Sequence, residues 1–132
     1  FIQKQVREGG SLNLEIANQN LLAAYRSGVT LMTGSDAGNP PTIHGPTVHR
    51  ELQLWVQAGI PPSVALRAAT ANAAALLGAG DRTGKIQKGY EATFLLVDGN
   101  PLQDIGATER ISTLFFKGER IRRADLFEDE KK

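Results

Sequence analysis

Cysteine is absent from this 132-residue sequence, and histidine occurs only twice. The lack of cysteine excludes disulfides and thiolate metal sites, while the compartment stays open and the sequence on its own favours the cytoplasm. No apolar run approaches the roughly 18 residues that span a bilayer, so we expect no membrane contact. The net charge is only +1, without the basic stripe that nucleic acid usually requires. Phosphate-binding loops, nucleophile elbows and dinucleotide fingerprints are missing as well.

The length and composition suit one globular domain of ordinary size. Hydrophobic residues make up 41% of the sequence and charged residues 22%, which allows a core and a normal polar surface. The hydrophobic pattern nevertheless changes near residue 79, from helices around a single strand to short extended runs. We therefore expect two parts, over residues 1–79 and 80–132.

The first part has apolar residues at helical spacing on either side of one short strand-like run. That run, Val29–Thr33, is brief and rich in β-branched residues, which is typical of a buried parallel strand. Proline favours the first turn of a helix, and Thr70 can end one helical segment and cap the next. The expected helices cover Leu14–Ser27, Val48–Ala58 and Pro61–Leu77, the last interrupted at Thr70, and a helix end or loop covers residues 1–11.

The second part contains extended runs separated by turn residues. Gly118-Glu119 predicts a tight hairpin turn between two strands, and the charged tail over residues 128–132 is expected to be frayed. The strands are too few to form a stable domain without further partners. The expected extended runs are Thr83–Gln87, Ala92–Val97, Ile111–Lys117 and Arg120–Arg122.

Asp36 follows the predicted strand closely, between Gly34 and Gly38. Functional groups of (β/α) barrels project from the C-terminal ends of buried parallel strands, which is where this carboxylate is expected. Such a carboxylate can bind a divalent cation and accept a proton from an activated water. Asp at a strand-to-loop turn also commonly caps backbone N–H groups, and the local pattern alone favours that structural role.

His44 and His49 lie five residues apart across a proline, so they do not form the i, i+4 pair of a helical metal site. His44 lies in the loop after the strand, where it can face a substrate or simply be solvated. His49 is expected to support a neighbouring group through a hydrogen bond. Arg50 and Glu51 indicate a solvated or interdomain ion pair, and Asn72 indicates a helix cap.

Four short segments form a combined signature. They are Thr33–Gly38; His44-Gly45 with His49–Leu52; Ala58–Ile60 with Ala65–Ala74; and Gly84–Gly89 with Ala92–Leu102. Each segment is weak alone. In this order and at these spacings, over about residues 12–122, they resemble the C-terminal portion of amidohydrolase superfamily proteins, especially the imidazolonepropionase-like and prolidase-like group.

The resemblance implies an α/β fold. Residues 1–79 would be the C-terminal end of a metal-dependent hydrolase (β/α)8 TIM barrel, and residues 80–132 would supply strands of a small composite β-sandwich. Val29–Ser35 would then be the eighth barrel strand. Asp36 would match the strand-eight aspartate that ligates metal and acts as general base. The implied reaction is hydrolysis of a C–N bond in an amide, cyclic amide or dipeptide-like substrate by metal-activated water.

The same resemblance implies a divalent metal in the complete protein, expected to be zinc as one or two ions. The family's His-x-His motif, bridging lysine and two further histidines are missing from this sequence, so we expect this chain alone to hold no metal and to be inactive. The expected partners are a small-molecule substrate and the N-terminal portion of the barrel, and a homo-oligomer stays open. The alternative is a truncated, non-catalytic fragment or interaction module of an amidohydrolase relative.

Overall fold

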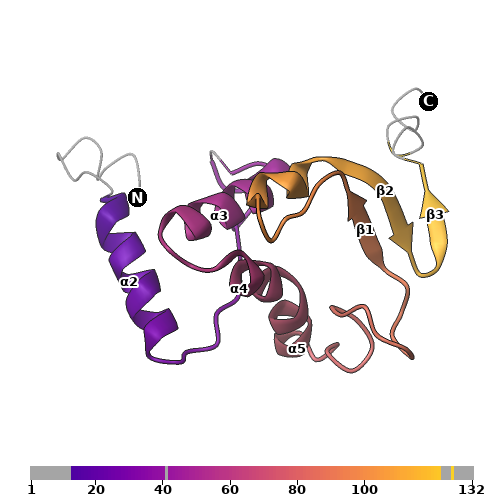
Figure 1. Cartoon of the computed structure of the whole chain (residues 1–132), viewed down its shortest axis with the longest axis horizontal. Helices are drawn as coiled ribbons and strands as arrows, with labels where there is room; N and C mark the ends of the chain where they lie inside the picture. Colours follow the sequence, from indigo (N-terminus) through magenta and orange to yellow (C-terminus); the bar gives the residue numbers. More distant parts are fainter. Residues whose placement is uncertain (1–12, 41, 123–125, 127–132) are drawn as a thin grey trace.

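The computed structural model describes residues 13–40, 42–122 and 126, with helices first along the chain and a small sheet last (Figure 1). The expectations for residues 1–11 and 128–132 lie outside the described residues. The helices are α2 Leu14–Arg26, α3 Pro46–Gln57, α4 Pro62–Arg67, the π-helix η1 Ala68–Asn72, α5 Ala73–Leu76 and the 3-10 helix η2 Ile105–Glu109. The strands are β1 Phe94–Val97, β2 Ile111–Phe116 and β3 Glu119–Ile121.

Helix α2 begins and ends where the local chemistry favours it, which confirms the helix predicted there. Asn13 Oδ1 accepts a hydrogen bond from the main-chain N–H of Glu15 at 2.9 Å, so it caps the first turn. Gly28 follows the last turn with a φ of 75°, a left-handed conformation that glycine adopts without steric cost. The next helix, α3, begins at Pro46, earlier than predicted, because proline needs no hydrogen-bond acceptor at a first helical position.

The third predicted helix runs without a break from Pro62 to Leu76 as α4, η1 and α5. The predicted interruption at Thr70 is therefore wrong. Thr70 lies inside η1, and its Oγ1 donates a hydrogen bond to the main-chain oxygen of Leu66 at 2.7 Å. The hydroxyl is satisfied within the helix, so it does not end it. The helix instead widens locally into a π turn, a feature that is frequent at functional sites.

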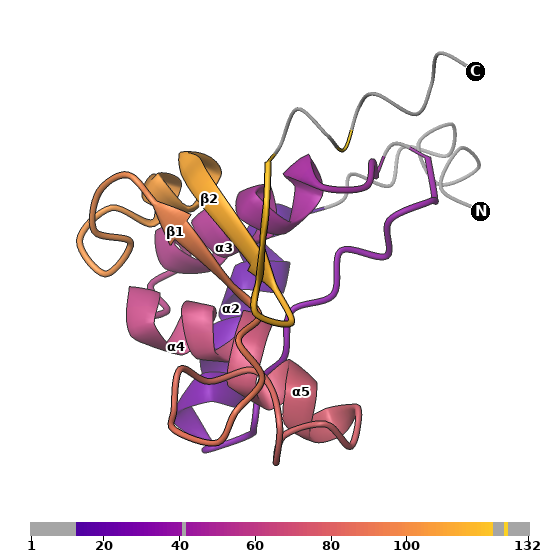
Figure 2. The ribbon, with the colours of Figure 1, turned by 90° about the vertical axis from the view of Figure 1, so that its right-hand side faces the viewer.

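The segment Val29–Thr33 forms no strand in the part of the chain that the structure describes, so the predicted strand is wrong here. A parallel strand requires main-chain hydrogen bonds to a neighbouring strand, and the described residues supply none beside this segment. Figure 2 shows the chain between α2 and α3 running along one side of the helices. From Leu31 to Asp36 the residues alternate between half-buried and exposed, which is the side-chain period of an extended chain.

A small apolar core lies between the helices. Ile60, which links α3 to α4, is only 1% exposed and is the largest side chain that the described residues bury completely. Ile105 joins the same cluster, so η2 packs against helices from much earlier in the sequence. The buried cluster consists of Leu52, Ile60, Ala65 and Ile105, bordered by partly buried Leu21, Leu22, Tyr25, Leu31, Trp55, Val56, Val64, Leu66 and Ala69.

The sheet is antiparallel, with the strand order β1-β2-β3. Phe94 and Phe115 are paired across β1 and β2, and their rings stack with centroids 4.8 Å apart. The hairpin turn lies at Lys117 and Gly118, whose φ angles are 51° and 88°. Two positive φ angles define the two-residue turn that suits the twist of a hairpin. The turn and β3 therefore come one residue earlier than the predicted Gly118-Glu119 turn.

The extended run predicted over Thr83–Gln87 is wrong, because these residues form bends and irregular backbone. Gly84 has a φ of 85° and lies directly against the π turn of the preceding helix. A Cβ added there would be 2.7 Å from Ala74 Cβ and 2.9 Å from the main-chain oxygen of Thr70. Close packing against a helix, which only glycine allows here, therefore replaces strand pairing.

Several large apolar side chains remain exposed. Leu14 and Ile16 on α2 are each 55% exposed, and Leu95 and Leu96 on β1 are 46% and 48% exposed. Ile86 is 88% exposed. Apolar groups that are exposed together on one element are typical of surfaces that contact other protein. Within the described ranges, no helix has both the length and the apolar character needed to cross a membrane.

Candidate functional site

Asp36 lies in a tight turn that follows the alternating segment. Its φ is 50°, which is uncommon for residues other than glycine, although Asp and Asn tolerate it better than most. Its Oδ2 accepts a hydrogen bond from Asn39 Nδ2 at 2.8 Å, and its main-chain oxygen accepts one from Thr42 Oγ1 at 3.0 Å. The residue is exposed, and its Oδ1 takes no hydrogen bond from the described residues. One carboxylate oxygen therefore fixes the turn, while the other is available as far as the described residues go.

Two helices hold the segment that leads to Asp36. The main-chain N–H of Gly34 donates to Glu51 Oε1 in α3 at 3.0 Å. Asn72 Nδ2 in η1 donates to the main-chain oxygen of Leu31 at 2.7 Å, and this second contact is partly buried. Side chains from separate helices thus bind main-chain groups two and five residues before Asp36.

Glu51 forms no solvated ion pair with Arg50 in the described part of the chain, and an interdomain pair stays a prediction. The interpretation of Asn72 as a helix cap is wrong, because its side chain makes no capping hydrogen bond. Arg50 Nη1 approaches Gln53 Oε1 at 3.4 Å, while Glu51 turns toward Gly34. Glu51 lies beside Leu52, which is buried, and one turn before the half-buried Trp55. That position on the inner side of α3 is the signal in the sequence that could have indicated a buried role. For Asn72 the sequence holds no comparable signal, because its partner comes from tertiary packing.

The two histidines lie in different surroundings. His44 is exposed and borders the Asp36 turn, since a Cβ built on Gly38 would be 3.6 Å from His44 Nε2. His49 is half-buried, and its Nδ1 lies 3.2 Å from Thr108 Oγ1, so that this contact joins α3 to η2. A substrate-facing role for His44 and a supporting role for His49 stay predictions.

The described residues do not form a metal site by themselves. Across residues 13–40, 42–122 and 126, no three or more histidine, aspartate or glutamate side chains gather closely enough to hold an ion. A catalytic zinc site usually takes three protein ligands and keeps one position open. A metal ion at Asp36 would therefore need its other protein ligands from outside the described residues.

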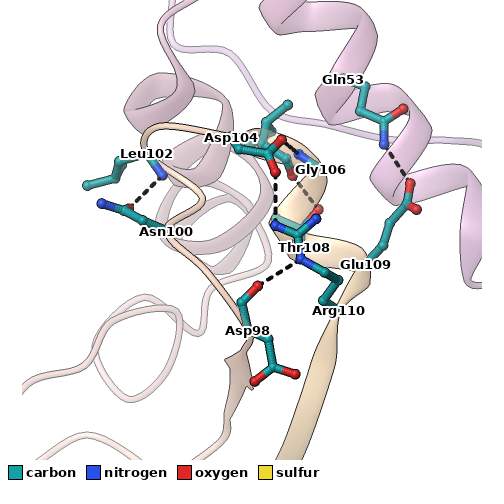
Figure 3. Close-up of polar contacts among 10 residues, drawn as sticks. Gln53, Asp98, Asn100, Leu102, Asp104, Gly106, Thr108, Glu109 and Arg110 are labelled. Carbon is teal, nitrogen blue, oxygen red and sulfur yellow. Dashed lines mark hydrogen bonds and ion pairs between the residues drawn. The ribbon is translucent and has the colours of Figure 1, made fainter.

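A second polar cluster connects η2 to the sheet (Figure 3). Asp104 Oδ1 accepts the N–H of Gly106 at 2.9 Å, and its Oδ2 pairs with Arg110 Nη2 at 2.9 Å. Arg110 Nε also donates to the main-chain oxygen of Asp98 at 2.9 Å. The Arg110 guanidinium and, secondly, the Gly106 N–H lower the pKa of the Asp104 carboxyl below its usual value. Because the pair is exposed and capped locally, the lowered pKa reflects a structural ion pair.

A sequence model of the amidohydrolase family matches residues 11–121, so this chain belongs to the amidohydrolase family. Ochratoxinase of Aspergillus niger is 37% identical over 105 residues, covering 76% of this chain and 21% of that protein. A solved Xaa-Pro dipeptidase with bound methionine is 29% identical with a TM-score of 0.71, covering 80% of this chain and 25% of that chain. A solved molinate hydrolase is 25% identical with a TM-score of 0.74, covering 83% and 27%.

These similarities confirm the predicted membership of the amidohydrolase superfamily and of its prolidase-like group. They imply the TIM-barrel enzyme fold for the family, of which this chain contains α/β elements and a small antiparallel sheet. The relatives are hydrolases. The chain spans about a fifth of the length of the curated relatives that it matches.

Proposed function

We propose that this chain is part of a metal-dependent amidohydrolase that cleaves a C–N bond, and that Asp36 is its contribution to the metal site. The observation that carries the proposal is the Asp36 turn, in which Asn39 binds one carboxylate oxygen and no hydrogen bond from the described residues reaches the other. The alternating burial of the preceding residues supports an extended segment that delivers Asp36 to a barrel mouth. Family membership supports the hydrolytic chemistry.

A bound divalent cation, which we expect to be zinc as one or two ions, would supply the activation of water. The part of Asp36 is to bind with its free oxygen, to accept a proton from that water, and to return the proton to the leaving nitrogen. A carboxylate suits both tasks, because its oxygens can bind such cations and can accept a proton. The hydrogen bond from Asn39 would keep the carboxylate oriented during this exchange.

The proposed substrates are amides, cyclic amides or dipeptide-like molecules. Similarity to a Xaa-Pro dipeptidase supports the dipeptide-like class. His44 borders the Asp36 turn and would face the substrate. The rest of the barrel, including the histidine ligands, would come from an N-terminal portion that packs on exposed apolar side chains such as Leu14 and Ile16.

The test compares Asp36→Asn with Asp98→Asn in the complete translation product of the gene, loaded with zinc and assayed on a panel of dipeptides and N-acyl amino acids. Asp98 is a matched control, because it is an exposed aspartate whose main-chain oxygen alone takes part in the contacts of Figure 3. Loss of a general base typically lowers kcat by roughly 10²–10⁴-fold. We expect a loss of this size in Asp36→Asn and turnover within about twofold of the unmodified protein in the control. Near-normal turnover in Asp36→Asn refutes the proposal.

A second candidate function is a non-catalytic interaction module. The exposed apolar side chains of α2 and β1 favour it, because they offer a contact surface without requiring chemistry. This alternative predicts that the complete translation product lacks a His-x-His motif upstream and cleaves nothing in the panel when zinc is added. An upstream His-x-His after a strand, together with turnover that depends on Asp36, excludes it.

A further inference from the structure

We propose that Glu51 and Asn72 are positioning residues that hold the main chain of the Asp36 segment and so set the direction of the Asp36 carboxylate. This inference rests on the proposed function, since it assigns their role in the same site. The two side chains come from α3 and η1 and bind Gly34 N–H and the Leu31 oxygen. Neither contact belongs to a strand ladder or to a helix cap.

The burial of one Glu51 carboxylate oxygen is energetically unfavourable, and a positioning role explains why glutamate is present there. Its Oε2 is buried and has no hydrogen-bond partner in the described part of the chain, although its Oε1 binds Gly34 at 3.0 Å. A buried polar atom without a partner is unfavourable, and such atoms are few in native proteins. Glutamate at this place is therefore poorly suited to stability alone. Glu51 instead provides the hydrogen-bond acceptor for the main-chain N–H of Gly34, two residues before Asp36.

Asn72 reaches the segment from the π turn. Asn72 is half-buried and is the last residue of η1. Its Nδ2 points out of the helix and donates a hydrogen bond to the main-chain oxygen of Leu31 at 2.7 Å. A π turn contains one residue more than an α turn, which changes the direction of the side chains beyond it. Leu31 itself packs against the buried core cluster. The contact thus ties one end of the segment to a part of the fold that cannot shift freely.

The Asp36 turn needs such support. A left-handed φ is unfavourable for an L-residue, and a strained residue persists only where its surroundings hold it. Asp36 has a φ of 50°, and its own hydrogen bonds go to Asn39 and Thr42 in the same exposed loop. The contacts at Leu31 and Gly34 connect this loop to the helices. Losing them would leave the carboxylate free to turn, which lowers the rate of a step that requires its position.

The test uses the complete translation product with five variants and two readouts. Glu51→Ala and Asn72→Ala remove the two contacts. Gln53→Ala is the control on α3, because the hydrogen bonds that it removes, to Glu109 (Figure 3) and from Arg50, do not involve the Asp36 segment. Thr70→Ala is the control within η1. The first readout is kcat and KM. The second is hydrogen exchange of peptides that cover residues 29–36, which include the Gly34 N–H and require no activity.

We expect kcat to fall roughly 10–100-fold in Glu51→Ala and Asn72→Ala with little change in KM, as is typical for loss of a group that orients a ligand. Glu51→Ala should also speed exchange over residues 29–36. Both controls should leave kcat and exchange unchanged. The variant Glu51→Gln keeps an acceptor oxygen and should retain activity and protection within about threefold.

Unchanged kcat and exchange in Glu51→Ala and Asn72→Ala overturn the inference, because neighbouring strands would then hold the segment without them. Equal losses in the controls, or a loss in Glu51→Gln as large as in Glu51→Ala, overturn it as well. The proposed function fails separately, if Asp36→Asn keeps its turnover. In that case hydrogen exchange alone still decides whether Glu51 holds Gly34.

Discussion

Gly84 offers a sharp test of how the loop after the helices packs against η1. An added Cβ would lie 2.7 Å from Ala74 Cβ, 2.9 Å from the Thr70 oxygen and 3.1 Å from Ala71 Cα. Contacts under about 3 Å with backbone atoms cannot be relieved by moving a flexible side chain. The substitution Gly84→Ala must therefore displace either the loop or the π turn that contains Asn72.

The expected loss of folding stability in Gly84→Ala has two parts. The φ of Gly84 is 85°, and an L-residue in the left-handed region costs roughly 1–2 kcal/mol. Inserting a methyl group into a packed site adds typically about 1–3 kcal/mol. Gly89 is a matched control, because its φ is 89° and a Cβ there meets nothing within 4 Å. Gly84→Ala should thus destabilise by about 2–5 kcal/mol, and Gly89→Ala by about 1–2 kcal/mol.

The assay is urea denaturation of the complete translation product, comparing midpoints at equal slopes. The loss of unfolded-chain freedom on replacing glycine is common to both variants and cancels in the comparison. The remaining difference, about 1–3 kcal/mol, measures the contact of Gly84 with the helix. Equal midpoints for the two variants would refute the packing of Gly84 against η1.

Two further predictions concern the ion pair and the core. Arg110→Gln should raise the pKa of Asp104 toward its ordinary value, as measured by carboxyl-carbon NMR titration, because the guanidinium is the main cause of its lowering. The stabilisation linked to this lowered pKa is present above the ordinary pKa and is lost as the pH falls through the lowered pKa. The variant should therefore lose less stability on acidification than the unmodified protein, and an unchanged titration of Asp104 would contradict this. Ile60 is 1% exposed, so Ile60→Ala should lower the free energy of unfolding by about 2–5 kcal/mol and Ile60→Val by about 0.5–1.5 kcal/mol, as measured by urea denaturation. Midpoints equal to that of the unmodified protein would show that Ile60 is not packed in the core.

Elements that local chemistry determines could be predicted from the sequence. Helix α2 follows from apolar spacing and from Gly28 at its end, and β1 and β2 follow from their apolar runs. The predicted hairpin turn differs from the observed one by one residue, because Lys117 adopts a positive φ that is unusual for lysine and cannot be predicted from its side chain. The strand over Val29–Thr33 could not form alone, since a strand depends on a neighbour as much as on its own residues.

The candidate site was predictable only in part. Asp36 could be predicted as a candidate because it follows a short apolar run and lies between two glycines. Glu51 and Asn72 act through main-chain groups 17 and 41 residues away, and no spacing rule connects such positions. The 3-10 helix η2 was missed for a similar reason, since Ile105 is buried by α3 and α4 rather than by its own surroundings.

The most direct test of the account is a crystal structure of the zinc-loaded complete translation product, with anomalous scattering to locate the ion. We expect zinc within about 2.0–2.2 Å of the free Asp36 oxygen, with Asn39 still bound to the other oxygen. A zinc ion held wholly by other residues, with the Asp36 carboxylate pointing into solvent, would contradict it.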